Sequence, residues 1–264
     1  MERKKGICAE CLCHGTAEAA LSKIKRAGFD GFFAMYRSHE EARRLKEVGE
    51  QCSLEFEFIH APFEDINALW RPGLSYLDSY RQLEKSIEAA AECAVPAVIV
   101  HTTSGWFAPP VSDVGLARYD ALVELAIQKG VKVAFENQRR LGTLACLMDR
   151  YERVSEVVFC YDSGHEHCFT ETVPFLKLYG KRLACTHLHD NTGRLPHDYW
   201  ANNDAHLLPF DGDIDFARVA REMEEVDYRG RYMLEAFRTG RYAEMEDEAF
   251  LSLAFSRLKR MEKL

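Results

Sequence analysis

Short apolar runs alternate with amphipathic stretches along the whole chain, and this alternation restricts the possible folds more than any other feature. Eight runs are predicted to be strands because most are rich in Val, Ile, Phe and Tyr, and several are almost continuously apolar. Strands of that composition are typical of a parallel sheet that is buried on both faces. The predicted strands are residues 5–12, 31–36, 56–61, 96–101, 131–137, 157–162, 183–190 and 232–237.

The segments between these runs carry apolar residues at helical spacing, as in the last stripe of Leu251, Ala254, Phe255 and Leu258. Eight strands alternating with eight helices predict an α/β fold, namely a (β/α)8 TIM barrel with a parallel eight-stranded sheet. We expect one such domain over residues 1–264. A doubly wound open sheet is the alternative, but no G-x-G-x-x-G or Walker A sequence follows a strand to support its nucleotide-binding forms.

The charge balance limits the partners that the chain is expected to bind. There are 34 Lys and Arg against 42 Asp and Glu, which gives a net charge of −8. Such a surface does not favour nucleic acid or an anionic membrane. We find neither a signal peptide nor an apolar segment of about 20 residues that would span a bilayer. Nine cysteines without a secretion signal indicate a reducing compartment, so we expect a cytoplasmic protein.

Side chains that can bind a metal stand at the ends of six consecutive predicted strands. In order they are His60, His101, Glu136, Asp162 with His165, His187 and Glu235. In a barrel these strand ends converge on one mouth, where buried carboxylates are costly unless a cation neutralises them. Each residue by itself is equally compatible with an ordinary satisfied polar group. Their repetition at one position per strand–helix unit predicts at least one divalent ion per chain, with Mn, Zn, Co or Mg as candidates.

A long polar segment follows the seventh predicted strand. Residues 190–213 show no clear helical periodicity, and connections of this length are usually functional or mobile. The segment contains Asp204 and His206, two further ligand types placed two residues apart. An ordinary polar loop is the alternative.

Several short motifs follow one another through the chain. They are HAP (60–62), His101, FEN (135–137), DSGH (162–165), HLHDN (187–191), DAHLLPFDG (204–212) and LE (234–235). In this order they resemble the xylose isomerase-like barrel superfamily over residues 28–237. Its members include sugar isomerases and epimerases, inosose-pathway enzymes and DNA-repair enzymes of the endonuclease IV type.

The resemblance implies roles for the matching residues. In sugar epimerases of this kind one divalent ion is held by the residues that match Glu136, Asp162, His187 and Glu235, and the match to His165 contacts a substrate oxygen. In the endonuclease type a cluster of three zinc ions would in addition use His60, His101, His165, Asp204 and His206. The chain departs from many relatives in its second strand, where Phe33 stands in place of a Glu. A substrate contact through that acid is therefore not expected here.

The leading hypothesis is metal-dependent isomerisation or epimerisation of a sugar or sugar phosphate through an enediolate. Glu136 and Glu235 would remove and return a proton beside the carbonyl, and His165 would assist. For substrate binding the candidates are His60, His101, Trp106 and Arg194, since an aromatic ring can pack on a sugar and an Arg can grip a phosphate or carboxylate. Arg139, Arg140 and Arg238 also follow strands and are open to the same role.

Two other functions stay open at this point. One is a metal-dependent phosphodiesterase of the endonuclease IV type that acts on abasic DNA. The other is a metal-binding sensor that binds a sugar-like ligand without turnover. The expected partner is a small sugar or polyol, and a homo-oligomer is compatible with the sequence.

Overall fold

The fold is described from a computed structural model that places residues 3–170 and 173–264. Its strands are β1 (Lys5–Cys8), β2 (Gly31–Met35), β3 (Glu55–His60), β4 (Ala97–His101), β5 (Lys132–Glu136), β6 (Val157–Asp162), β7 (Leu183–His187) and β8 (Tyr232–Leu234). The α-helices are α1 (Ala17–Arg26), α2 (His39–Gln51), α3 (Leu77–Glu92), α4 (Asp113–Lys129), α5 (Leu141–Arg150), α6 (Ser163–His165), α7 (Phe175–Tyr179), α8 (Phe216–Glu225) and α9 (Asp247–Met261). Short 3₁₀ or π turns are η1 (Ile66–Trp70), η2 (Glu166–Thr170), η3 (Gly180–Arg182) and η4 (Gly240–Tyr242).

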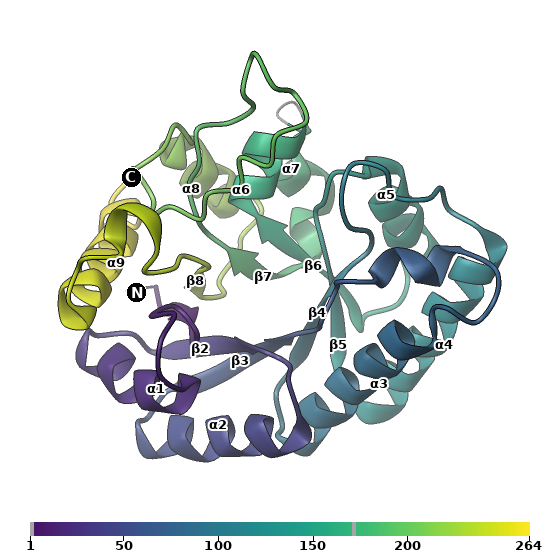
Figure 1. Ribbon diagram of the computed structural model, residues 1–264, viewed down its shortest axis with the longest axis horizontal. Coiled ribbons are helices and arrows are strands. Elements are labelled where there is room, and N and C mark those ends of the chain that lie inside the picture. The colour runs from purple at the N-terminus through teal and green to yellow at the C-terminus, as the bar shows by residue number, and fades with distance from the viewer. Residues whose placement is uncertain (1–2, 171–172) are drawn as a thin grey trace. The chain divides into compact units, whose positions relative to one another are not determined.

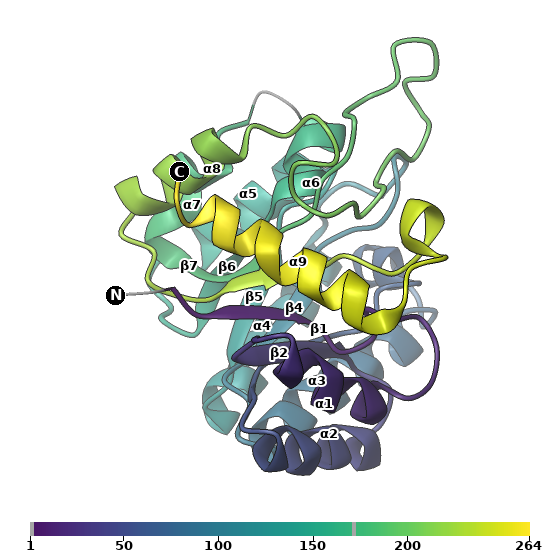
Figure 2. The ribbon, with the colours of Figure 1, turned by 90° about the vertical axis from the view of Figure 1, so that its left-hand side faces the viewer.

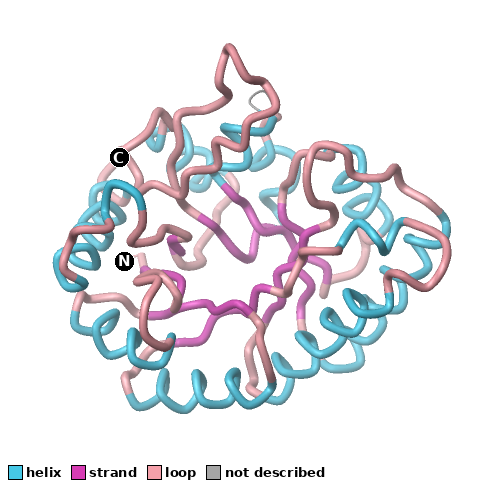
Figure 3. The backbone as a smooth tube through the Cα atoms, in the orientation of Figure 1, coloured by secondary structure: helices cyan, strands magenta, loops and turns pink. Residues whose placement is uncertain are grey.

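All strands of the described residues belong to one sheet with the order β7-β6-β5-β4-β3-β2-β1-β8. Neighbouring strands pair in parallel, for example β1 with both β2 and β8, and β4 with both β3 and β5. A parallel bridge between Leu188 and Leu234 links the end of β7 to β8, so that the strand order returns on itself. Each strand is followed along the chain by a helix (Figures 1 and 3). The chain therefore folds as the predicted (β/α)8 TIM barrel.

The burial of the strands explains why their sequences are so apolar. Every residue of β4 and of β6 is buried, as expected for strands covered on both faces. The helices bury one stripe each, such as Leu251, Ala254 and Leu258 of α9. Phe255 of the predicted stripe is only half-buried, because its ring lies at the edge of that stripe against Phe29 (ring centroids 5.2 Å apart).

By its internal packing the chain divides into two compact units. The first comprises Met1–Ala34, Arg44–Phe56 and Tyr161–Leu264, and the second comprises Met35–Arg43 and Glu57–Cys160. In the first unit α9 runs beside α1, as Figure 2 shows. In the second unit Trp70 of η1 stacks on Tyr119 of α4, with ring centroids 5.0 Å apart.

Most predicted strands are one or two residues shorter or unchanged in the structure, but three of them end three or four residues earlier than predicted. The predicted ranges 5–12, 183–190 and 232–237 end at Cys8, His187 and Leu234. Residues beyond these ends, such as Leu12 and Ala236, are buried although they are not in a strand. Apolar composition therefore reports burial, and at these ends burial continues after the strand pairing has stopped.

No helix among the residues that the structure describes is long and apolar enough to cross a membrane.

Tight packing at one glycine gives a prediction for stability. A Cβ added at Gly115 of α4 would lie 2.1 Å from the Trp70 ring, whereas one added at Gly142 of α5 would meet nothing within 4 Å. We expect Gly115→Ala to lower the free energy of unfolding by about 1–3 kcal/mol through overpacking. The control Gly142→Ala should be neutral or raise it by about 0.5 kcal/mol, since Ala is the better helix former. Urea unfolding measures both, and equal effects would contradict the described packing.

Candidate metal centre

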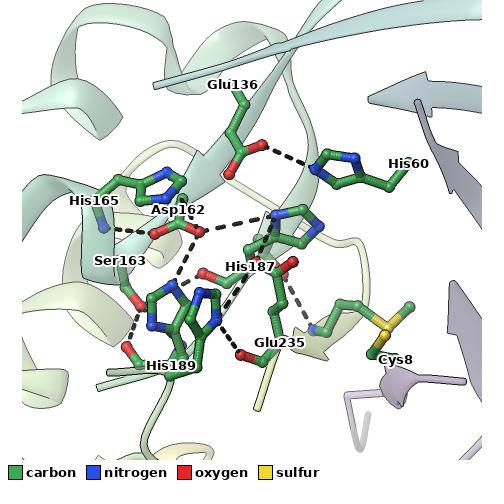
Figure 4. A network of polar contacts seen from close by, with 12 residues as sticks. Cys8, His60, Glu136, Asp162, Ser163, His165, His187, His189 and Glu235 are labelled. Carbon is green, nitrogen blue, oxygen red and sulfur yellow. Dashed lines mark hydrogen bonds and ion pairs between the residues drawn. The ribbon is translucent and has the colours of Figure 1, made fainter. Parts of the chain in front are cut away.

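The second unit carries three predicted site residues at the ends of neighbouring strands. His60, His101 and Glu136 end β3, β4 and β5, and the pairing of β4 with β5 places His101 opposite Glu136. Glu136 Oε2 lies 2.8 Å from His101 Nε2 and 3.5 Å from His60 Nε2 (Figure 4 draws the latter contact). All three side chains are buried, and together they offer donor atoms close enough to hold one metal ion.

The hydrogen bonding of His60 shows which of its two ring nitrogens carries the proton in the neutral ring and which one carries the lone pair. His60 Nδ1 lies 2.9 Å from the carbonyl oxygen of Ala61, which accepts only, so Nδ1 must carry the proton. In neutral His60 the Nε2 lone pair therefore faces the Glu136 carboxylate. Two acceptors buried 3.5 Å apart need a cation or a proton between them. This arrangement fits a metal ligand whose other nitrogen is held by a backbone carbonyl.

The first unit gathers the other three predicted ligands from strand ends. Asp162 ends β6, His187 ends β7, and Glu235 directly follows β8. His187 Nδ1 lies 3.3 Å from Glu235 Oε2 and 3.8 Å from Asp162 Oδ2. Asp162 and His187 are fully buried and Glu235 is 8% exposed. Phe33, which stands where the family resemblance implies a Glu, packs its ring against that of His187, with ring centroids 4.9 Å apart.

His165 joins this group through both its backbone and its ring. Its backbone N–H donates to Asp162 Oδ1 at 2.6 Å, so Asp162 caps the turn that follows β6 (Figure 4). Its ring Nε2 lies 3.1 Å from Asp204 Oδ2, in the segment 190–213. The same Asp204 oxygen lies 3.4 Å from His206 Nε2. The structure thus brings the predicted pair Asp204 and His206 to His165, as a second gathering of donors in this unit.

Electrostatics links these three side chains. Burial acts to raise the pKa of Asp204, but the attraction of His165 and His206 leaves it well below its usual value. Burial acts to lower the pKa of His206, but Asp204 raises it to about 10. His206 Nδ1 also lies 2.9 Å from the Glu235 carbonyl oxygen, so Nε2 faces Asp204 as in the His60 arrangement. Without a metal, His206 is therefore protonated at neutral pH.

Two residues of the HLHDN motif that the prediction did not single out are also part of the site. His189 Nε2 lies 3.1 Å from Asp162 Oδ2 and 3.8 Å from Asp204 Oδ1. Asp190 accepts four backbone N–H groups at 2.9–3.1 Å; the donors are those of Asn191, Phe210, Gly212 and Ile214. His189 could have been predicted from the sequence, because side chains alternate along an extended chain and residue 189 therefore lies on the same side as His187. The contacts of Asp190 could not have been predicted, because they depend on the path that the segment 190–213 takes in the folded protein.

The remaining predicted contacts lie on the loops. Trp106 follows β4 and packs beneath the Arg139 guanidinium, whose carbon is 5.0 Å from the ring centroid. Arg194 donates from Nε to the Cys168 carbonyl at 3.2 Å and lies over the Tyr199 ring at 4.3 Å. Arg238 instead donates to two backbone carbonyls of its own unit, those of Ala243 and Met245, which assigns it to holding the segment after β8.

Comparison with known proteins assigns this fold to a family. The family model described as xylose isomerase-like TIM barrel matches residues 21–258. The uncharacterized protein y4fM of Sinorhizobium fredii is 32% identical over 177 residues, which cover 59% of this chain and 53% of that protein. The chain thus spans about half the length of that relative. An inosose dehydratase of Clostridium perfringens is 22% identical over 260 residues, with 84% of this chain and 82% of that protein covered.

Among solved structures, D-allulose 3-epimerase from Methylomonas sp. matches with a TM-score of 0.77 over 99% of this chain and 98% of that chain. At 14% identity this likeness shows the fold alone. The family model covers most of the sequence and has the fold that the structure shows. The chain therefore belongs to the xylose isomerase-like TIM barrel family.

Proposed function

We propose that this chain is a divalent-metal-dependent isomerase or epimerase of sugars or sugar phosphates. The proposal is carried by the gathering of buried carboxylates and imidazoles at the ends of β3 to β8, because such a set is costly to bury without a cation. One relative supports the substrate class, since it is named for an inosose. Epimerisation and dehydration beside a carbonyl both begin with the removal of a proton from the neighbouring carbon.

We assign the principal ion to Glu136, Asp162, His187 and Glu235. The donor atoms of the last three already converge within the first unit. Glu136 ends β5, the neighbour of β6 in the sheet, and its strand pairs with the strand that ends in Asp162. Mixed carboxylate and imidazole ligands fit Mn, Zn, Co or Mg. These four residues would hold the ion, which would supply Lewis-acid stabilisation of negative charge on the substrate oxygens.

The protein's own side chains move the protons. One of Glu136 and Glu235 takes the proton from the substrate carbon, and the other delivers its own proton to the opposite face, so that the two carboxyl groups exchange protonation states in an epimerisation. In an isomerisation the carboxyl group that took the proton can return it to the neighbouring carbon. His101, 2.8 Å from Glu136, orients that carboxylate. His165 holds a substrate hydroxyl and passes protons between oxygens. His60, Trp106 and Arg194 complete the substrate contacts in this proposal.

A second candidate is a phosphodiesterase of the endonuclease IV type, which acts on abasic DNA. It is favoured by one observation: two further groups of donors accompany the principal set. One is His60 and His101 around Glu136, and the other is His165 and His206 around Asp204. Asp204 Oδ1 is buried without a hydrogen-bond partner among the described residues, as expected for a carboxylate oxygen that binds a cation. The net charge of −8 favours the sugar enzyme.

We further propose that the protein acts in the cytoplasm as a single domain over residues 1–264, on a small sugar or polyol and without nucleic acid. All nine cysteines are free thiols, which suits a reducing compartment.

The two-carboxylate mechanism predicts the loss of proton exchange in conservative variants. The metal-loaded protein is incubated in D₂O with ketoses, ketose phosphates and an inosose, and proton NMR follows deuterium entry beside the carbonyl. We expect Glu136→Gln and Glu235→Gln each to slow exchange by about 10³-fold, because each removes one general base. The control Glu124→Gln, on the exposed face of α4, should retain the wild-type rate. Full exchange in either site variant, with its fold intact by circular dichroism, contradicts the mechanism.

Metal content separates the two candidate functions. After dialysis, the sugar enzyme should hold one tight ion per chain, which Asp162→Asn and His187→Gln lose. Content of about three zinc ions per chain would instead favour the phosphodiesterase.

Calorimetry in buffers of different ionisation enthalpy gives a second measurement, the number of protons released when the metal binds. At pH 8 metal-free His206 is protonated, because its pKa is raised to about 10. If the ion binds only to the principal set, wild type and His206→Gln should release the same number of protons. If an ion also binds to Asp204 and His206, wild type should release about one proton more than the variant.

A further inference from the structure

One arginine in the second unit is held against an aromatic ring beyond the metal-binding strand ends. Arg139 follows Glu136 by three residues, and Trp106 follows His101 by five. The Arg139 guanidinium carbon lies 5.0 Å from the Trp106 ring centroid. Because β4 and β5 are paired with His101 opposite Glu136, the loops that carry Trp106 and Arg139 begin at neighbouring points of the sheet. A guanidinium supported by a ring keeps a fixed fork of N–H donors, which suits the paired oxygens of a phosphate or a carboxylate.

The loop that carries Trp106 is anchored at its base. Asn67 of η1 donates from Nδ2 to the Ser104 carbonyl at 2.7 Å and accepts the Ser104 N–H at 3.0 Å. The Trp70 indole N–H donates to the Thr102 carbonyl at 2.8 Å. Three hydrogen bonds within three residues fix the start of the loop before any ligand arrives. A site held in this way loses little conformational freedom when it binds.

Positive charge accompanies the stack. Arg140 follows Arg139 directly, and the first turn of α5 contains no acidic residue. Arg139, Arg140 and the positive end of the α5 dipole therefore bring positive charge to the loop that follows Glu136.

We propose that Arg139, supported by Trp106, is a specificity residue that binds an anionic substituent of the substrate, a phosphate ester or a carboxylate. This inference rests on the proposed sugar function, because it narrows the substrate to an anionic sugar. Asn67 is a positioning residue, since it acts on the stack only through the loop that carries Trp106.

Binding of matched sugars tests the proposal without any turnover. Calorimetry with the metal-loaded protein compares D-fructose, D-fructose 6-phosphate and D-galacturonate, and the last two distinguish a phosphate from a carboxylate. We expect at least one anionic sugar to bind wild type about tenfold more tightly than D-fructose, as for a charge-assisted bidentate contact. Arg139→Gln should abolish this preference and leave the affinity for D-fructose unchanged. Arg139→Lys should restore only part of it, because an ammonium lacks the fork.

Arg140→Gln is the matched control, because it removes the same charge one residue away. We expect it to retain the preference for the anionic sugar. If Arg139→Gln and Arg140→Gln lose the preference for the anionic sugar equally, the preference comes from the positive charge of the region and not from a contact with Arg139, and the proposal is overturned. A preference that survives in Arg139→Gln, or its absence from wild type, would also overturn it. These outcomes are independent of the proposed reaction, which fails instead if Glu136→Gln keeps full proton exchange.

Discussion

The negative charge buried at the strand ends is the constraint on which the rest of this structure depends. Asp162 and Glu136 are fully buried and Glu235 nearly so, and each faces imidazole nitrogens instead of water. In a medium of low dielectric such carboxylates need a compensating cation, whether a proton on a histidine or a metal ion. In both His60 and His206 the Nδ1–H group donates a hydrogen bond to a backbone carbonyl, and Nε2 faces a carboxylate. That arrangement fixes in advance which ring nitrogen of each histidine would bind the cation.

The scaffold keeps this arrangement by tying its loops to the same strand ends. Asp190 gathers four backbone N–H groups from both ends of the segment that carries Asp204 and His206. Burial raises the pKa of Asp190, while those N–H groups oppose the rise and offset the cost of burying its charge. Ser163 donates to the His189 carbonyl at 2.7 Å and joins the turn after β6 to the end of β7. Structural and ligand-holding residues therefore alternate along the same motifs, which explains why the motifs are so dense in polar side chains.

Much of this could be predicted from the sequence. An apolar run that ends in a polar side chain indicates a buried strand, and it also indicates which end of that strand lies at the mouth of the barrel. The order of His60, His101, Glu136, Asp162, His187 and Glu235 followed from that rule, and each of them does end or follow a strand. Strand lengths were less accessible: Leu12 and Ala236 are buried beyond the last paired residue, so composition cannot mark where pairing stops. The contacts of Asp190 and Asn67 join residues brought together by the chain path, and no local pattern encodes them.

The replacement at Phe33 bears on the kind of substrate that this charge distribution can accept. The family resemblance implies a Glu at this position in many members, whereas here an apolar ring lies against His187. The exchange leaves this position beside a proposed ligand without a carboxylate. With fewer carboxylates in the site, a substrate that carries its own negative charge meets less repulsion. The guanidinium of Arg139, held against Trp106, suits the same kind of anionic group. An apolar Phe33 beside His187 and an arginine supported by Trp106 both agree with the anionic sugar that we propose as the substrate.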